Sequence, residues 1–498
     1  MRAWFAGAFE RCLELCAAAR PRDSESKMYV ALIMARALLR LARADEALTA
    51  LRDAAAIPCK TDEAMTVRML TGAAYVLRGD LERGLDLLVA AQADAAGAHR
   101  TIQSEIALNI ALAQYGRGHF DEAERALNVV ESDSDIVFAR ALQYRGWIAF
   151  ARADSARATA FFVSALQHHD RCRHYDRFVE VGCIRSLAHL AVERLDRRTW
   201  SIVEERRARL EWLGTELAAA RFWITYCAAA FASDVQGNLL AAAREAREAE
   251  RIAPTQAYRV QAQCKRAAIA RCAGEPLSQR DHVDAATEIY ATLKPSTLAG
   301  DEAIVPLILA EELANAGCAS EARSAFDTFV KISRASPLVW MRRWPTTYAY
   351  QRLVEAHVLE CGGERRTAAR RYREAFDLYA KLGYKRRAVA AALRLARVSA
   401  APDAGRYAEV HTRRLPAQSW LRREAHAVNE PALSLTAVQR EVLALICQGK
   451  SNPDIARSRK RSLHTIRNLV ARLFVIFAVS SREELAVECV RRGLYAPK

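Results

Sequence analysis

The sequence predicts an all-α protein in which a long helical solenoid precedes a small domain of four short helices. Three observations indicate this fold class. Ala, Leu, Arg and Glu dominate the 498 residues while the 20 Gly and 13 Pro are few, a composition that favours helix over strand. A short phrase recurs at separations of 35 to 39 residues in the first third of the chain. Helix caps and apolar stripes then alternate closely after residue 432.

Length and charge set the frame for these observations. A chain of 498 residues is long enough for two to four domains, and 52% hydrophobic residues supply large cores. The net charge of +16 is expected of a protein that binds nucleic acid, because phosphate neutralisation dominates such affinity. The excess is spread along the chain, so an arginine-rich composition alone is the alternative explanation.

The recurring phrase is a Gly or Ala turn, then a polar residue, then a small residue that opens a helix. The small residues closing the first five phrases are Cys12, Ala47, Gly84, Ala123 and Ala158. Weaker phrases occur at 237–242, 317–322 and 362–368, and the stretches 170–230 and 255–300 contain helices without the phrase. The first unit lacks most of its first helix, which predicts either a lone capping helix or a start site upstream.

Spacing within one unit is informative. Gly146 precedes Ala158 by twelve residues, and Phe162 and Ala165 follow four and seven residues later. This pattern resembles the tetratricopeptide repeat, in which two antiparallel helices approach closely at small residues and a larger residue fills the groove. The resemblance implies a superhelix whose concave surface binds a peptide, a partner protein or a small effector. A generic helical bundle is the alternative.

The segment 400–431 interrupts the repeats with three prolines and clustered arginines, and it lacks helical periodicity. We therefore expect a linker there, with Trp420 and Leu421 docking it on a neighbour. The predicted domains are a helical repeat domain at 1–399, the linker at 400–431 and a four-helix domain at 432–498.

Capping signals delimit the four C-terminal helices. Thr436 with Gln439 forms a capping box, Asn452 is the expected cap of the second helix, Ser462 caps the third, and Ser481 begins the fourth with a box to Glu484. The predicted apolar stripes are Val438, Val442, Leu445 and Ile446 on the first helix, Ile455 and Ala456 on the second, Ile466, Val470, Leu473 and Phe477 on the third, and Leu485, Val487, Val490 and Leu494 on the fourth.

The opposite stripe of the third helix is small, polar and cationic, which suits the major groove of DNA. This region, LTAVQREVLALICQGKSNPDIA, SLHTIRNLVARLF and AVSSREELA, resembles the LuxR-type helix-turn-helix. The resemblance implies base recognition by the third helix and dimerisation through the fourth. The candidate DNA-binding residues are Asn452, Arg459, Lys460, Arg461, Ser462, His464, Thr465, Arg467, Asn468 and Arg472.

The chain departs from the family pattern at several positions. Leu469 replaces a frequent His, and Ile476 replaces the Lys of the family's K-L-G, which removes one phosphate contact. Arg459, Lys460 and Arg461 are positioned to contact the DNA backbone and so to replace the phosphate contact that is lost at Ile476.

Other functions lack their motifs. No phosphate-binding G-x-x-x-x-G-K-[ST], H-E-x-x-H or G-x-S-x-G occurs, no alternating strand–helix pattern forms a receiver domain, and the 12 cysteines show no C-x-x-C spacing. We expect no enzyme, no metal and no cofactor, and free thiols fit the cytoplasm. No apolar run reaches the length of a membrane span.

The sequence therefore predicts a DNA-binding transcriptional regulator. Its repeats would sense an effector or a partner protein, and it would bind double-stranded DNA as a homodimer. One alternative is a protein-interaction scaffold whose helix-turn-helix no longer reads sequence, and another is a subunit that needs a separate ATPase partner.

Overall fold

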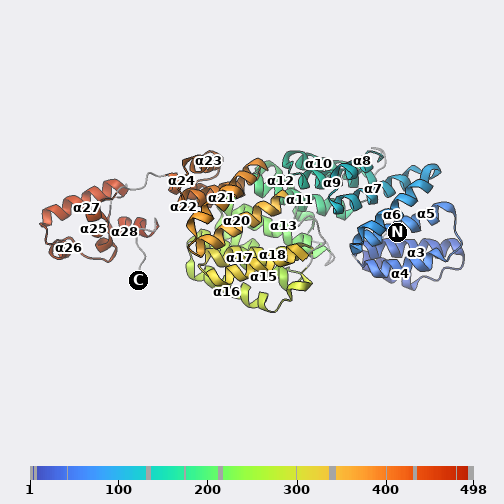
Figure 1. Cartoon of the computed structure of the whole chain (residues 1–498), viewed down its shortest axis with the longest axis horizontal. Helices are drawn as coiled ribbons and strands as arrows, with labels where there is room; N and C mark the ends of the chain where they lie inside the picture. The colour runs from blue at the N-terminus through green and yellow to red at the C-terminus, as the bar shows by residue number, and fades with distance from the viewer. Residues whose placement is uncertain are drawn as a thin grey trace. The chain divides into compact units, whose positions relative to one another are not determined.

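The computed structural model describes residues 4, 8–41, 43–130, 136–172, 175–210, 217–298, 300–335, 344–399, 401–429, 435–477, 479 and 481–491. All regular elements in these ranges are helices (Figure 1), which confirms the predicted all-α class. The chain divides into two compact units, Met1–Arg422 and Arg423–Lys498, called unit 1 and unit 2 below.

The α-helices of unit 1 are α2 (Phe9–Ala18), α3 (Ser24–Arg40), α4 (Ala44–Ala55), α5 (Thr61–Arg78), α6 (Leu81–Asp94), α7 (Arg100–Arg117), α8 (Phe120–Leu127), α9 (Ile136–Ala151), α10 (Ser155–His169), α11 (Arg177–Arg194), α12 (Arg197–Arg207), α13 (Ala218–Phe231), α14 (Leu239–Arg251), α15 (Gln256–Ala273), α16 (Pro276–Ala291), α17 (Val305–Asn315), α18 (Ala319–Ala335), α20 (Pro345–Cys361), α21 (Arg365–Lys381), α22 (Lys385–Val398) and α23 (Pro402–Thr412). The short elements are η1 (Ala95–Gly97), η2 (Ala208–Leu210), η4 (Ala232–Gln236), η5 (Pro295–Thr297) and η6 (Gly300–Ile304), of which η4 is a π-helical turn.

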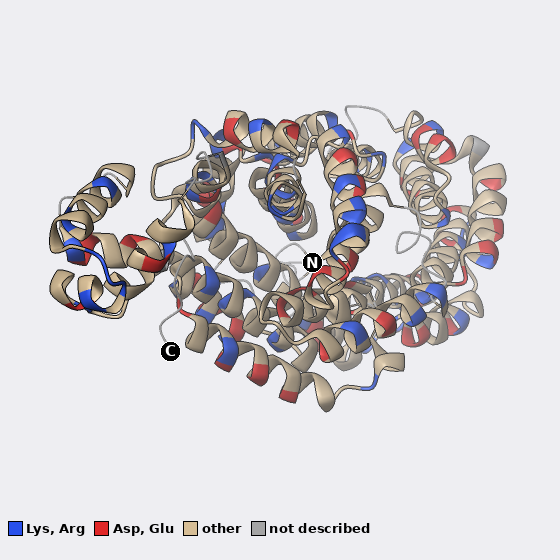
Figure 2. Cartoon of the chain, turned by 60° about the vertical axis from the view of Figure 1, so that its left-hand side comes forward, with Lys and Arg blue, Asp and Glu red and all other residues tan. Residues whose placement is uncertain are grey.

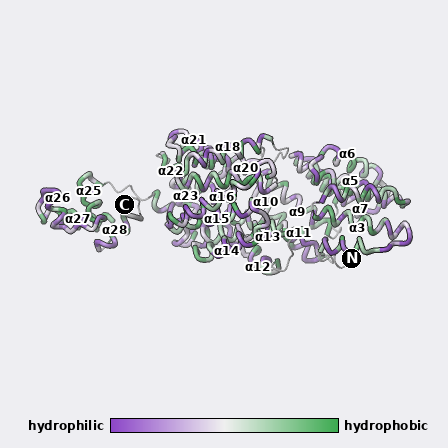
Figure 3. The backbone as a smooth tube through the Cα atoms, turned by 90° about the horizontal axis from the view of Figure 1, so that it is seen from below, coloured by the Kyte–Doolittle hydropathy of each residue, from purple (hydrophilic) through white to green (hydrophobic). Residues whose placement is uncertain are grey.

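Consecutive helices of unit 1 pack as antiparallel hairpins, such as α5 with α6, α9 with α10 and α20 with α21 (Figure 1). Neighbouring hairpins then stack on one another, which makes unit 1 a tetratricopeptide-like α-solenoid. Hydrophobic and hydrophilic residues alternate along these helices (Figure 3), as expected of helices that bury one face.

Small residues bring the paired helices together where the spacing predicts it. A Cβ atom on Gly84 would lie 2.8 Å from the carbonyl oxygen of Gly72, so the backbones of α5 and α6 nearly touch. A Cβ on Gly146 would lie 2.5 Å from the ring of Phe162, which fills the groove between α9 and α10. Ala158 and Phe162 are fully buried, and the repeat spacing is confirmed.

The stretches without the phrase are hairpins too. In α16, Val283 and Ala286 are fully buried at the positions four and seven residues after Gln279, which stands where other units have a small residue. Before α12, Leu195 takes the left-handed conformation (φ 57°) that other units give to glycine. The helical repeat therefore continues through these stretches, because the spacing of the buried positions is kept while the residue types at those positions change.

Helix α22 contacts α11, so the hairpins between these two helices wrap round until the last meets the first. Buried charges form this contact. Arg386 donates to Glu193 at 2.8 Å and to Asp234 of η4 at 3.0 Å, and Arg387 donates to Glu193 at 3.0 Å. Elsewhere acidic and basic residues are interspersed along the outer helices (Figure 2).

The prediction that 400–431 lacks helix is wrong. It contains α23 and α24 (Trp420–Asn429), because Pro402 is accommodated in the first turn of α23 and the ring of Tyr407 packs 4.9 Å from that of Phe376. Residues 430–434 lie outside the described ranges. The domain limits drawn from the sequence stay a prediction.

The end of unit 1 is fixed on η4. The buried hydroxyl of Ser419 donates to the carbonyl oxygen of Asp234 at 2.6 Å, and the guanidinium of Arg271 lies 5.7 Å from the ring of Trp420. Gly237 (φ 74°) permits this docking, since a Cβ there would lie 2.5 Å from the backbone of Gln418. Trp420 therefore docks as expected.

Unit 2 contains α25 (Ala437–Cys447), α26 (Asn452–Ser458), α27 (Leu463–Phe477) and α28 (Arg482–Arg491). One apolar cluster holds them together, and its buried members are Leu435, Val442, Leu443, Ile446, Ile455, Ala456, Ile466, Val470, Leu473, Phe477, Leu485 and Cys489. The capping box of Thr436 and Gln439 is confirmed.

Two details of unit 2 differ from the prediction. Val438, which the predicted stripe of the first helix places in the core, is 41% exposed, and Leu443, which that stripe omits, is buried in the core. Ser451, not Asn452, caps α26, because the Ser451 hydroxyl accepts from the amide of Asp454 while the Asp454 carboxylate accepts in return. These hydrogen bonds hold the pKa of Asp454 below its usual value.

Candidate nucleic-acid interface

A basic turn connects α26 to α27. The amide of Arg461 donates to the carbonyl of Ala456 at 3.0 Å, which closes the end of α26. Closure of this kind needs a left-handed residue, and Lys460 supplies it with φ 49° where glycine is the usual choice. Arg459, Lys460, Arg461 and Ser462 are all exposed on this turn. The turn therefore presents its charges at the start of α27.

Ser462 fixes the first turn of α27. Its hydroxyl accepts from the amide of Thr465 at 3.1 Å and shares a hydrogen bond with the Thr465 hydroxyl at 2.8 Å. The predicted cap is thus confirmed. The cap also orients Thr465, whose side chain stays exposed at the helix start.

Helix α27 separates two faces along its length. Ile466, Val470, Leu473 and Phe477 face the core of unit 2. The residues of the other face are exposed, namely His464, Arg467, Asn468, Ala471 and Arg472. Within it, the Asn468 amide and the His464 ring nitrogen lie 3.2 Å apart, a contact that joins residues one helical turn apart. The face is small, polar and cationic as the sequence predicts.

The predicted binding residues differ in how strongly unit 2 already engages them. Arg459 forms an ion pair with Glu441 of α25, and Asn452 accepts from Arg482 of α28 at 2.9 Å. By contrast, none of Lys460, Arg461, Arg467 and Arg472 forms an ion pair within the described part of the chain. These four side chains are the ones most available to phosphate oxygens or base edges.

Sequence reasoning missed Arg482 and Glu441. Arg482 also donates to the backbone carbonyl of Lys450, so it joins α28 to the start of α26. Ser481 and Arg482 at the start of α28 can be read from the sequence, but the contact of Arg482 with Asn452, 30 residues earlier in the chain, cannot.

The departures from the family pattern are absorbed by packing. Leu469 and Ile476 are half-buried against the core of unit 2, so apolar residues at these positions extend the core instead of facing solvent. The fourth helix buries Leu485 and leaves Val487 68% exposed. The side chain of Val490 and all of Leu494 lie outside the described residues.

Two short helices joined by a tight turn, the second with an exposed polar face, define a helix-turn-helix domain. Residues 433–489 match the LuxR family of bacterial regulatory proteins, and unit 2 carries this LuxR-family helix-turn-helix domain. A search of curated proteins finds no match to the chain.

Two solved structures are similar to the chain at 12% identity. One, described as a Rap protein complexed with competence and sporulation factor, covers 76% of this chain and 99% of its own with a TM-score of 0.39. The other, the APC/C hetero-tetramer Cut9–Hcn1, covers 86% of this chain and 85% of its own with a TM-score of 0.36. Similarity this low transfers neither a partner nor an activity.

Within the described ranges, no single helix has the length and apolar composition to cross a membrane. Helices Leu463–Phe477 and Arg482–Cys489 reach that length and apolar composition only when they are counted together, and the pair is bent by 59°. Both helices of that pair bury apolar residues in the core of unit 2.

Proposed function

We propose that the chain is a sequence-specific DNA-binding regulator of transcription. The observation that carries this proposal is the exposed face of α27, where Arg467, Asn468 and Arg472 project from a helix whose other face is buried. A recognition helix needs this division, since it inserts one face into the major groove while the other holds the domain together.

Each residue group has a role in this proposal. Arg467 and Asn468 read base edges, Arg because its fork matches guanine and Asn because its amide matches adenine. Lys460, Arg461 and Arg472 contact phosphates and set the register. Ser462 and Thr465 hold the helix start, where backbone amides also favour a phosphate.

Dimerisation through α28 is the second part of the proposal. Val487 is 68% exposed on α28, and Val438 is 41% exposed on α25. Both apolar side chains of unit 2 are therefore accessible to a second copy of the chain. Two copies place two recognition helices on half-sites one helical turn apart. The solenoid of unit 1 then senses an effector or a partner protein and shifts the balance between the free and the DNA-bound states.

The test is selection of DNA sequences by the full-length protein from a random pool. We expect an enriched motif with two half-sites, and we expect Arg467→Ala and Asn468→Ala each to relax the motif at one position and to weaken binding about tenfold or more. Arg457→Ala is the matched control, because Arg457 is exposed on α26 and pairs locally with Asp454. It should leave the selected motif unchanged.

The outcome that overturns the proposal is selection without enrichment. A full-length protein that binds every sequence equally, with the same affinity after Arg467→Ala, would instead be a scaffold with a helix-turn-helix that no longer reads sequence.

A further inference from the structure

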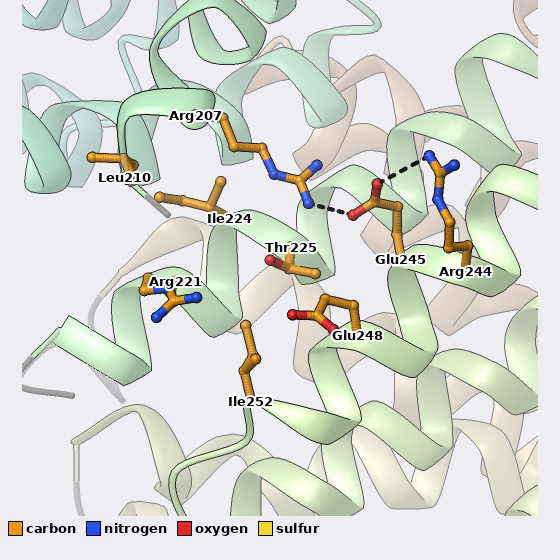
Figure 4. Close-up of a pocket in the computed structure, with 9 residues that line it drawn as sticks. All are labelled: Arg207, Leu210, Arg221, Ile224, Thr225, Arg244, Glu245, Glu248 and Ile252. Atoms are coloured by element: carbon orange, nitrogen blue, oxygen red, sulfur yellow. Dashed lines mark hydrogen bonds and ion pairs between the residues drawn. The ribbon is translucent and has the colours of Figure 1, made fainter. Parts of the chain in front are cut away.

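A cavity of about 270 Å³ lies between α12, α13 and α14 of unit 1, and charged residues around it pair with one another (Figure 4). Figure 4 shows Arg207 and Arg244 reaching the carboxylate of Glu245 from two sides. Arg251 donates to both carboxylate oxygens of Glu248, at 2.6 and 2.7 Å. The pair of Arg207 and Glu245 joins α12 to α14, so these charges stabilise the packing of unit 1.

Unit 2 brings two cysteine thiols together. Cys447 is the last residue of α25, and Cys489 lies near the end of α28, a helix that packs against α25 (Figure 1). The two side chains share a hydrogen bond. Cys489 is a buried member of the apolar cluster of unit 2, and Cys447 packs against that cluster. Two cysteines can be bridged only where their side chains face each other, and this pair meets that condition.

The two thiols differ in their access to solvent. Cys489 is 0% exposed, whereas Cys447 is half-buried and is followed by exposed residues at 448–450. Burial raises the pKa of the Cys447 thiol, and the hydrogen bond with Cys489 and the charge of Arg482 oppose this effect. A small oxidant therefore reaches Cys447 first, and Cys489 stands behind it as the thiol that can react with the product.

We propose that Cys447 and Cys489 form a reversible disulfide when a peroxide oxidises the protein. The sulfur of Cys447 attacks one oxygen of hydrogen peroxide, the O–O bond breaks, and the products are a sulfenic acid and water. The sulfur of Cys489 then attacks the sulfur of Cys447, and the hydroxyl leaves with the proton of Cys489 as a second water. The two thiols lose two electrons and two protons in all, and hydrogen peroxide is reduced to two waters.

The disulfide closes a loop around the elements of the candidate interface. Residues 448–488 contain α26, the basic turn and α27. A cross-link over a loop of this length restricts the unfolded chain and so stabilises the folded unit. Val487 is two residues before Cys489 and stays exposed, so the apolar side chain proposed for dimerisation remains accessible. Oxidation therefore fixes α28 against α25, and the role of this step in a regulator, unlike the disulfide itself, rests on the proposed function.

The experiment treats the full-length protein with hydrogen peroxide, blocks the remaining thiols by alkylation and maps the peptides by mass spectrometry. We expect one cross-linked pair of peptides that holds Cys447 and Cys489, and dithiothreitol should return both thiols. If both thiols are still alkylated after peroxide, the proposal is wrong. It is also wrong if Cys447 becomes a sulfinic acid while Cys489 is alkylated.

Variants locate the reaction. Cys447→Ser should abolish the cross-link and leave Cys489 open to alkylation after unfolding. Cys59→Ser is the matched control, because Cys59 is exposed between α4 and α5 of unit 1, and it should form the cross-link as the wild type does. Loss of the cross-link in Cys59→Ser would assign the oxidation to another thiol. Mapping of the wild type decides the proposal even where a variant fails to fold.

Hydrogen–deuterium exchange measures the effect on unit 2. The amides of α27 should exchange about tenfold or more slowly in the oxidised protein than in the reduced protein. Peroxide should leave their exchange unchanged in Cys447→Ser. Equal exchange in the oxidised and reduced wild type would contradict the stabilisation of unit 2 by the disulfide.

DNA selection with the same samples separates this inference from the proposed function. A protein that enriches a DNA motif but forms no cross-link refutes the disulfide alone. A protein that forms the cross-link and enriches no motif keeps the modification site and refutes its role in a DNA-binding regulator.

Discussion

The guanidinium of Arg386 lies 2.8 Å from the carboxylate of Glu193, across a separation of 193 residues in the chain. Glu193 is 2% exposed and Arg386 also holds Asp234 at 3.0 Å, so one side chain joins α22 to both α11 and η4. Removal of one partner from a buried pair is costly because the other charge stays buried.

Arg386→Met should therefore destabilise unit 1 by about 3 kcal/mol. Stability is lost because Glu193 loses one of its two arginine partners and keeps Arg387, while Asp234 loses the guanidinium of Arg386. Urea denaturation of the full-length protein, followed by tryptophan fluorescence, measures it. Arg365→Met is the control, since Arg365 is exposed on α21, and a shift no larger than in that control would contradict a structural role for the contact.

Stability should fall with acid below pH 6.5 because two histidines of unit 1, His189 (half-buried) and His357 (buried), stay neutral in the folded state. Burial lowers the pKa of His189 to about 4 and that of His357 to about 3. The unfolded chain takes up these protons near pH 6.5, so the stabilisation is present above that pH and is lost as the pH falls towards the folded values.

Each histidine should contribute about 2 kcal/mol of this loss between pH 7 and pH 5. The check is urea denaturation at both pH values for His189→Gln, which should show a smaller loss than the wild type. His119→Gln, at an exposed position of unit 1, serves as the control. Identical pH dependence in all three proteins would show that His189 is not held neutral.

Gly84→Ala should destabilise unit 1 by about 1–3 kcal/mol. Its added methyl would lie 2.8 Å from the carbonyl oxygen of Gly72 and 2.9 Å from the amide nitrogen of Val76, and backbone atoms cannot turn away as a side chain does. Gly97→Ala provides a matched comparison because nothing lies within 4 Å of a Cβ there. Equal thermal midpoints for the two variants would show that α5 and α6 do not approach closely.

Salt dependence should distinguish the arginines of the basic turn. Arg461→Ala should weaken binding to all DNA sequences uniformly and lower the slope of log affinity against log salt by about 1. Arg459→Ala should lower it less, because Arg459 is already paired with Glu441. Binding titrations from about 50 to 200 mM salt give both slopes. A larger effect of Arg459→Ala would mean that DNA displaces Glu441.

The sequence predicted those parts of the fold that depend on local chemistry. Ala158, Phe162 and Ala165 are buried at the predicted spacing, and Ser462 caps α27, because both features are set by residues within two helical turns. The repeat was not recognised where a position of the repeat holds a residue of another type. Gln279 in α16 stands where other repeats have a small residue, and Leu195 before α12 stands where others have glycine.

Long-range contacts explain the other differences. Segment 402–429 contains α23 and α24, which are stabilised by packing on α21 and by docking on η4, and the periodicity of the segment encodes neither contact. In unit 2, the exposed stripe of α27 followed from the sequence, but the engagement of Arg459 by Glu441 and of Asn452 by Arg482 did not. Contacts between charged side chains of different helices depend on how the helices are aligned against one another, and a single sequence does not give this alignment.

The contact between α11 and α22 has an evolutionary consequence. An open repeat array tolerates the gain or loss of one hairpin, because each repeat touches only its neighbours. Between α11 and α22 that freedom is gone, since an added or deleted hairpin would carry Arg386 away from Glu193 and Asp234. We expect relatives of this protein to vary in repeat number before α11 and to keep the number constant from α11 to α22.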